Sequence, residues 1–235
     1  DVERSRGLGD VYKRQAFISG GSRGIGLAIA NRLARDGADV TISGSNLAHV
    51  EAAMATISET AAGKVAGHAS DLRTVAGCQS AFDAHGNAHG GCDILVHSAG
   101  ATKGGVFPDQ PDADFQDGFA LKFHAAVRLS RLFWPSLTAA NGNVVMIVGG
   151  AARTPDPGFM VGGAVNAALA NFSKALAGQG LMDNVNVNWV SPGQTETDRL
   201  QQLLADRARH ENKTIDEVRA CLLYTSDAAD DTPCV

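Results

Sequence analysis

The stretch that decides the fold of this chain reads Ser19-Gly20-Gly21-Ser22-Arg23-Gly24-Ile25-Gly26. It follows the apolar run Ala16–Ser19 and opens a segment whose apolar residues recur every four positions, at Ile25, Ile29 and Leu33. Glycines allow a tight turn and the close approach of a pyrophosphate, which then rests on the positive N-terminus of a helix. The sequence therefore predicts a strand, a phosphate-binding loop and a helix, in that order.

The rest of the chain alternates short apolar runs with longer stretches of helical periodicity, the pattern of parallel strands joined by crossover helices. Six strands are expected, at 16–19, 39–43, 65–69, 93–97, 143–148 and 185–190. Helices are expected at about 24–36, 47–62, 73–85, 112–138 and 161–180. This order predicts an α/β fold: a single doubly wound Rossmann-type domain over 16–220, with helices on both faces of a parallel sheet. Thr197–Ala220 is charged and helical in composition and is expected to cover the substrate.

Composition narrows the function classes. The 235 residues carry 20 Lys and Arg against 25 Asp and Glu, a net charge of -5 that argues against nucleic acid or an anionic membrane as partner. No apolar run approaches the roughly 18 residues that a membrane span needs. The four cysteines lack disulfide or zinc spacing, the histidines are dispersed, and no leader is evident. We expect a cytoplasmic protein with reduced thiols and no metal site.

The two ends of the chain are related to each other as DNA. Asp10–Gln15 can be encoded by GATGTGTATAAGAGACAG, whose reverse complement in another frame encodes Cys221–Ser226. The element resembles a transposase sequencing adaptor, and the flanking residues resemble the adaptor arms. We therefore expect residues 1–15 and 221–235 to be non-native adaptor sequence. Tyr12 and Tyr224, the only tyrosines, both lie in these ends.

Four motifs occur in register along 16–220. They are the loop Ser19–Gly26, then Ser70-Asp71-Leu72, then Asp93-Ile94-Leu95-Val96-His97-Ser98-Ala99-Gly100, and finally Ser191-Pro192-Gly193 with Thr197. Together they resemble the short-chain dehydrogenase/reductase family, whose members bind a nicotinamide cofactor. The resemblance implies that Asp71 and Leu72 lie beside the adenine, that Ser98, Ala99 and Gly100 lie near the ribose, and that Pro192, Gly193, Thr195 and Thr197 surround the nicotinamide.

The choice between NAD and NADP depends on the end of the second strand, Ile42-Ser43-Gly44-Ser45-Asn46. An acidic residue there would bind the ribose 2′-hydroxyl of NAD, whereas a basic one would pair with the 2′-phosphate of NADP. No carboxylate stands in this segment, while Arg23 and the hydroxyls of Ser43 and Ser45 could hold a phosphate. NADP is therefore preferred over NAD, and a solvated Arg23 is the alternative.

The catalytic pattern of the family is missing. Its members use a Ser, a Tyr and a Lys with an Asn upstream, and these positions fall here on Gly149, Gly162, Asn166 and Lys122. A glycine has no proton to donate, and an amide carries no charge to lower the pKa of a phenol. Asn166 is kept as a ribose contact. Replacement proton donors are Lys122, His124 and His97, each weighed against a plain role on a helix surface or at the end of a strand.

Two functions stay open at this stage. One is an NAD(P)-dependent oxidoreductase acting on a small carbonyl or alcohol substrate, with an unconventional or impaired catalytic site. The other is a non-catalytic NAD(P)-binding sensor or partner subunit; a diverged, broken gene copy is a third reading. The resemblance also implies a homodimer or homotetramer formed through the helices at 112–138 and 161–180, and a further strand missing at the C-terminal end.

Overall fold

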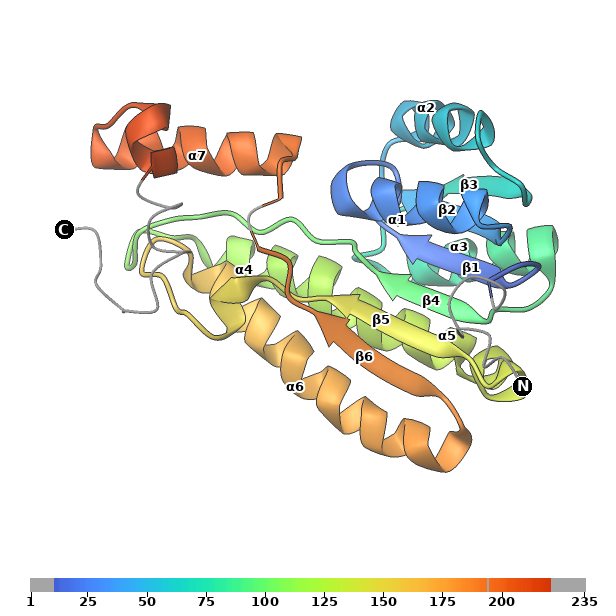
Figure 1. Cartoon of the computed structure of the whole chain (residues 1–235). Helices are drawn as coiled ribbons and strands as arrows, with labels where there is room; N and C mark the ends of the chain where they lie inside the picture. Colours follow the sequence, from blue (N-terminus) through green and yellow to red (C-terminus); the bar gives the residue numbers. More distant parts are fainter. Residues whose placement is uncertain (1–10, 194, 221–235) are drawn as a thin grey trace, which may run out of the picture. The chain divides into compact units, whose positions relative to one another are not determined.

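The computed structural model describes residues 11–193 and 195–220. They form one parallel sheet flanked by helices, with the strand order β3-β2-β1-β4-β5-β6 (Figure 1). The strands are β1 (Gln15–Ser19), β2 (Asp39–Gly44), β3 (Val65–Ala69), β4 (Ile94–His97), β5 (Asn143–Ile147) and β6 (Asn186–Val190). The helices are α1 (Gly24–Arg35), α2 (Leu47–Ser58), α3 (Val75–His89), α4 (Asp112–Gly118), α5 (Ala125–Ala140), α6 (Met160–Asp183) and α7 (Asp198–Glu211). The doubly wound Rossmann-type fold is confirmed, and the six predicted strands shift by one residue at most.

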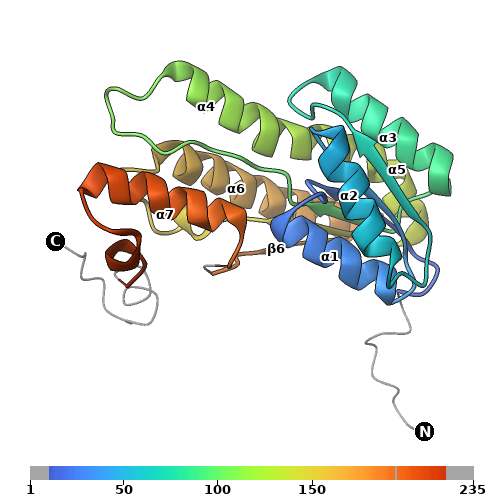
Figure 2. The ribbon, with the colours of Figure 1, turned by 90° about the horizontal axis from the view of Figure 1, so that it is seen from above.

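Helices cover both faces of the sheet because its strands alternate their side chains between two cores. Along β1, Ala16 and Ile18 pack with α1 and α2, whereas Phe17 packs on the other face with α3, α5 and α6. α1 lies beside α2, and α3 lies beside α5, as Figures 1 and 2 show from two directions. The sheet is thus buried on both faces, and its edges are left for loops.

The helix predicted over 112–138 is present from Asp112 to Ala140, and it contains a π-helical segment that was not predicted. The chain forms α4, then the π-helical segment η1 (Phe119–His124), then α5. A π-helix closes its hydrogen bonds over one more residue than an α-helix, and apolar periodicity over a long window does not detect one inserted residue. η1 lies between α4 and α5, and it contains Lys122 and His124, two of the candidate proton donors.

The chain divides into two compact units, one ending at Ser191 and the other starting at Pro192. The sheet and α1 to α6 belong to the first unit, and α7 belongs to the second, where Leu204, Ala208 and Val218 form a small core. Each described helix is too short or too polar to cross a lipid bilayer.

The predicted adaptor segments fall mostly on residues 1–10 and 221–235, which lie outside the described residues. The remaining five, Val11–Gln15, contact the first unit: Arg14 Nη1 lies 2.7 Å from Asp93 Oδ1, and Gln15 pairs with Asp39 as the first residue of β1. β1 therefore begins one residue before the predicted Ala16.

Candidate functional site

The glycine loop lies at the carboxyl end of β1, against the end of β4. Gly20 has a φ of +67°, and a Cβ placed on it would lie 2.7 Å from Ala99 Cα. Gly24 has a φ of +54° at the start of α1. Both positions require glycine, because other residues rarely adopt these angles and a side chain at Gly20 would collide with β4. The loop therefore brings backbone amides, rather than side chains, to this edge.

The first backbone amides of α1 are available to bind an anion. Arg23 occupies its N-cap position, and no side chain caps the helix. In contrast, the Asn46 side chain accepts from His49 N at the start of α2, and the Thr74 side chain accepts from Gly77 N at the start of α3. The first amides of a helix need acceptors, and a phosphate can supply them. The loop therefore fits a pyrophosphate group.

The site lies at the switch point of the sheet. β1 pairs with β2 on one side and with β4 on the other, so that the crossovers lead away in opposite directions. Ligands of open α/β sheets bind in the crevice outside the strand ends at this point. Ser19 Oγ accepts from the amides of Ser98 and Ala99 at 3.2 and 3.3 Å, which ties the two strand ends together. Gly100 follows at the exposed edge.

The residues predicted to bind the 2′-phosphate differ in how far they are exposed. Ser43 is fully buried in β2, and its hydroxyl has no hydrogen-bond partner in the described part of the chain. Ser45 and Arg23 are exposed. A ligand at the end of β2 can reach Ser45 and Arg23, whereas the contribution suggested for Ser43 is excluded by its burial.

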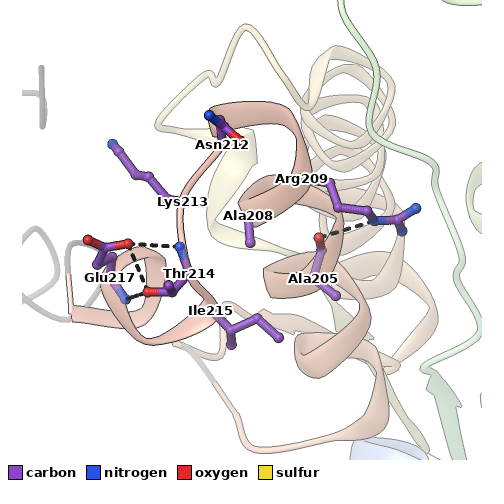
Figure 3. Close-up of a pocket in the computed structure, with 8 residues that line it drawn as sticks. All are labelled: Ala205, Ala208, Arg209, Asn212, Lys213, Thr214, Ile215 and Glu217. Carbon is purple, nitrogen blue, oxygen red and sulfur yellow. Dashed lines mark hydrogen bonds between the residues drawn. The ribbon is translucent and has the colours of Figure 1, made fainter.

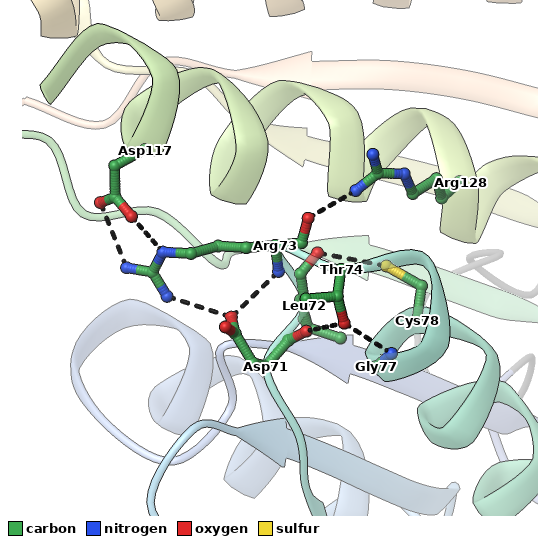
Figure 4. A network of polar contacts seen from close by, with 8 residues as sticks. All are labelled: Asp71, Leu72, Arg73, Thr74, Gly77, Cys78, Asp117 and Arg128. Atoms are coloured by element: carbon green, nitrogen blue, oxygen red, sulfur yellow. Dashed lines mark hydrogen bonds and ion pairs between the residues drawn. The ribbon is translucent and has the colours of Figure 1, made fainter. Parts of the chain in front are cut away.

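The predicted adenine residues belong to a polar network that links three elements (Figure 4). Arg73 Nη1 and its backbone amide contact Asp71 Oδ1 at 3.2 and 3.1 Å, and the Arg73 guanidinium also pairs with Asp117 of α4. The bond to Asp117, with that to Asp71, raises the pKa of Arg73. Arg128 of α5 donates to Arg73 O at 2.8 Å. Asp71 is exposed and accessible to a ligand, whereas the Leu72 side chain is buried in the core.

Asn166 joins Gly149 and Gly162, the two glycines that were predicted to stand at catalytic positions of the family. Its Oδ1 accepts from Gly149 N at 2.6 Å, and its Nδ2 donates to Gly162 O at 2.7 Å. The side chain is only 4% exposed. Burial of an amide is tolerated because both of its polar atoms are hydrogen-bonded. The ribose contact expected of Asn166 stays a prediction, and the observed role of this side chain is to connect β5 to α6.

Phe159 occupies the space beside Gly162. A Cβ placed on Gly162 would overlap the Phe159 ring. A Cβ on Gly149 would lie 3.1 Å from Asn166 Nδ2, a tight contact. The space beside the two glycines is therefore filled by neighbouring side chains, one of them an aromatic ring.

The three candidate proton donors lie in different environments. His97 is 4% exposed on β4, and its Nε2 lies 2.9 Å from Ser130 Oγ. Desolvation lowers the pKa of His97 to about 3, so it stays neutral and internal. His124 is exposed at the end of η1. Lys122 is half-buried, and its Cδ lies 3.0 Å from the place of a Cβ on Gly100. Of these three candidates, Lys122 is the one whose side chain lies against a predicted cofactor residue, Gly100.

The residues predicted around the nicotinamide fall in the second unit. Thr195 Oγ1 donates to Gly193 O at 3.2 Å, and Thr197 Oγ1 accepts from Leu200 N at 3.3 Å as the cap of α7. Pro192 precedes this turn. The same unit contains a hollow of about 620 Å³ between α7 and residues 212–217 (Figure 3). None of the predicted site residues lines this hollow.

Three residues of the site were not predicted from the sequence: Arg73, Asp117 and Phe159. Arg73 directly follows the Asp71-Leu72 motif, and this adjacency is the signal that could have identified it. Asp117 is 44 residues from Arg73 and reaches it only through tertiary packing. Phe159 lies three residues before Gly162, and its aromatic side chain at the start of the helix is the signal that could have identified it.

Comparisons with known proteins agree with this geometry. The family model of the short chain dehydrogenases matches residues 14–208. The chain is 31% identical over 213 residues to the uncharacterized oxidoreductase YvaG of Bacillus subtilis, covering 90% of this chain and 79% of that protein. It is 33% identical over 196 residues to nodulation protein G of a Rhizobium species, covering 81% and 78%.

Solved structures of similar fold contain nicotinamide cofactors. L-Sorbose reductase of Gluconobacter frateurii, complexed with NADPH and L-sorbose, superposes with a TM-score of 0.80 at 29% identity, covering 84% of this chain and 76% of that one. A short chain dehydrogenase of Burkholderia cenocepacia in complex with NADP gives 0.76 at 32% identity, covering 80% and 77%. The NADH-dependent reductase A1-R′ complexed with NAD gives 0.75 at 25% identity, covering 80% and 81%.

Proposed function

The chain belongs to the short-chain dehydrogenase family, and on this basis we propose that it is an NAD(P)-dependent oxidoreductase that interconverts a carbonyl compound and its alcohol. The observation that carries the proposal is the glycine loop at the β1–β4 switch point, with the start of α1 left without a side-chain cap. Side chains cap the starts of α2 and α3, whereas α1, which directly follows the glycine loop, begins without such a cap. The substrate is a small molecule.

The residues present would hold the cofactor along the carboxyl edge of the sheet. The loop amides and α1 receive the pyrophosphate, Asp71 faces the adenine side, and Ala99 and Gly100 line the ribose side. When bound, the nicotinamide supplies or accepts a hydride. The protein contributes the binding, the orientation and the environment of the reacting carbonyl.

NADP is the proposed cofactor. Arg23 and Ser45 are exposed on either side of the expected 2′-position, and no carboxylate stands at the end of β2 to repel a phosphate. The structural relatives include proteins solved with NADPH, with NADP and with NAD, so the preference depends on these side chains. Arg23→Leu is expected to weaken NADPH binding and to leave NADH binding unchanged.

The catalytic site is unconventional or impaired, because neither Gly149 nor Gly162 offers a side chain to the carbonyl. A positioned general acid typically contributes about 100- to 10,000-fold in rate. The second candidate function is a non-catalytic NAD(P)-binding sensor or partner subunit. The bonds from Asn166 to both glycines favour this alternative, since the side chain at the expected lysine position uses its polar atoms on the backbone.

We also propose how the protein assembles and where in the cell it is located. A homodimer or homotetramer would form through α4, α5 and α6, the helices that correspond to the predicted 112–138 and 161–180 segments. Cys78 and Cys92 are free, buried thiols, which supports a reducing cytoplasmic location.

The deciding experiment is a fluorescence titration of the protein with NADPH and NADH, followed by a turnover assay. Saturable binding is expected, tighter for NADPH. Oxidation of NADPH by benzaldehyde or cyclohexanone would establish an enzyme, whereas binding without turnover of these probes would favour the sensor.

Gly24→Asp is the control for both measurements. It places a carboxylate at a left-handed position beside the expected pyrophosphate, and it should abolish both binding and turnover. If wild-type protein and Gly24→Asp oxidise NADPH at the same rate, the activity does not belong to this site.

A further inference from the structure

We propose that Lys122 is the proton donor of the reduction, acting through its Nζ in place of the side chains that Gly149 and Gly162 lack. The inference rests on the proposed function, because it concerns the same site. It goes further by assigning a catalytic residue on η1, an element outside the glycine loop and outside β5 and α6.

Lys122 is half-buried on η1, the π-helical segment that directly precedes α5. The next residues along the helix, Ala125 and Ala126, are in the core, each 2% exposed. The lysine stem therefore lies where the helix passes from the core to the surface. The π-helical turn places this lysine at the end of the sheet rather than under it.

The stem of Lys122 covers Gly100. A Cβ on Gly100 would meet Cδ, Cγ and Cε of Lys122 at 3.0, 3.4 and 3.5 Å. Gly100 directly follows Ala99, whose Cα is the atom that a Cβ on Gly20 would strike. An unbroken set of contacts therefore runs from the phosphate loop through Ala99 and Gly100 to Lys122. The side chain lies where a cofactor seated on that loop would extend along β4.

Three other polar side chains near this end of the sheet have hydrogen-bond or ion-pair partners inside the protein. His97 is buried on Ser130. Asn166 uses its amide on backbone atoms of Gly149 and Gly162. Arg73 pairs with Asp71 and Asp117. Among the described residues at this edge, Lys122 is the ammonium group that lies against a cofactor position.

The reaction balances with Lys122 as the acid. As the hydride reaches the carbonyl carbon, the electron pair of the C=O π bond moves to oxygen. The Lys122 ammonium gives one proton to that oxygen, which forms the alcohol O–H bond and leaves a neutral amine. Water then reprotonates the amine. In the reverse direction, the neutral amine takes the hydroxyl proton as the hydride leaves.

The test replaces Lys122 with alanine and supplies the amine in solution. With the best carbonyl probe found in the turnover assay, Lys122→Ala should lower kcat by about 100-fold or more. Propylammonium should restore part of the rate because it can enter above Gly100, whereas tetramethylammonium, which has no proton to give, should not. Lys174→Ala is the matched control, since Lys174 is exposed on α6.

A second readout does not depend on turnover. Bound NADP⁺ should slow the acylation of Lys122 by a water-soluble amine reagent, as followed by mass spectrometry, and should leave Lys174 unaffected. Wild-type turnover in Lys122→Ala, a loss that propylammonium does not reverse, or unchanged acylation in protein saturated with NADP⁺ would each overturn the assignment while leaving the proposed oxidoreductase standing. Absence of NADPH binding and turnover in the wild type would overturn the proposed function as well.

Discussion

At the residue scale, the site shows how polar side chains acquire different roles from their surroundings. Asn166 and His97 are both buried at the end of the sheet, and both have a hydrogen-bond partner inside the protein. Lys122 is half-buried and lies at the edge. Burial disfavours a charged imidazole, and it explains why a histidine beside the expected cofactor residues is unsuited to proton transfer.

His97 and His85 should make the protein less stable in acid. Burial lowers the pKa of His97 to about 3 and that of His85 to about 4, against 6.5 when unfolded. The unfolded state therefore binds more protons between these values, and stability falls as the pH drops below 6.5. From pH 7 to pH 5 each histidine should cost about 2 kcal/mol of unfolding free energy.

Urea unfolding of the wild type and of His97→Gln at the two pH values measures this effect. The variant should lose about 2 kcal/mol less than the wild type over the same interval, whatever its stability at pH 7. Equal losses would mean that His97 is protonated as readily in the fold as in the unfolded chain.

At the element scale, α4, η1 and α5 form one helical arm, residues 112–140, that is held at the strand ends by contacts with Arg73. Arg73, after β3, pairs with Asp117 of α4, and Arg128 of α5 donates to the carbonyl of Arg73. These contacts hold both ends of the π-helical segment that carries Lys122. The arm is therefore positioned from the adenine side of the site, although its lysine lies on the other side of Gly100.

The Arg73–Asp117 pair should contribute measurably to this positioning. Because both side chains are partly exposed, at 32% and 40%, the coupling is expected to be at most about 1 kcal/mol. A double-mutant cycle with Arg73→Met and Asp117→Asn in urea unfolding measures it.

The control cycle uses Arg32 and Asp36, an exposed pair within α1. Such pairs are typically worth about 0.3–0.5 kcal/mol. A coupling at Arg73–Asp117 no larger than in the control would show that this pair does not hold α4.

At the scale of the whole molecule, the two compact units differ in how much apolar surface they bury. The first unit has a core on each face of the sheet, while the described part of the second has three buried apolar side chains, Leu204, Ala208 and Val218. Local stability follows local burial. The two units are therefore expected to open independently.

Hydrogen exchange followed by mass spectrometry tests this expectation. Amides of α7 should exchange well before those of β1 and β4 in the protein without ligand, because breaking a small core costs less free energy. Simultaneous exchange of α7 and β1 would indicate that the units unfold together.

The sequence by itself determined the fold and the cofactor loop. Strand and helix periodicities are local, and the glycine requirements at Gly20 and Gly24 come from backbone angles that a short motif specifies. The loss of the usual catalytic residues was also visible, since a glycine at 149 or 162 has no side chain in any conformation.

Only the tertiary structure decided what surrounds Gly149, Gly162 and Gly100. The bond of Asn166 to Gly149 N and the contact of Lys122 with Gly100 each join segments separated along the chain, while the overlap of Phe159 with a side chain at Gly162 depends on the local conformation at the start of α6. The π-helical turn that contains Lys122 lies between α4 and α5 in one continuous helix and packs against α6, and periodicity does not encode either feature. Long-range packing has no local signature, and the difference between a surface lysine and one at the cofactor edge arises from it.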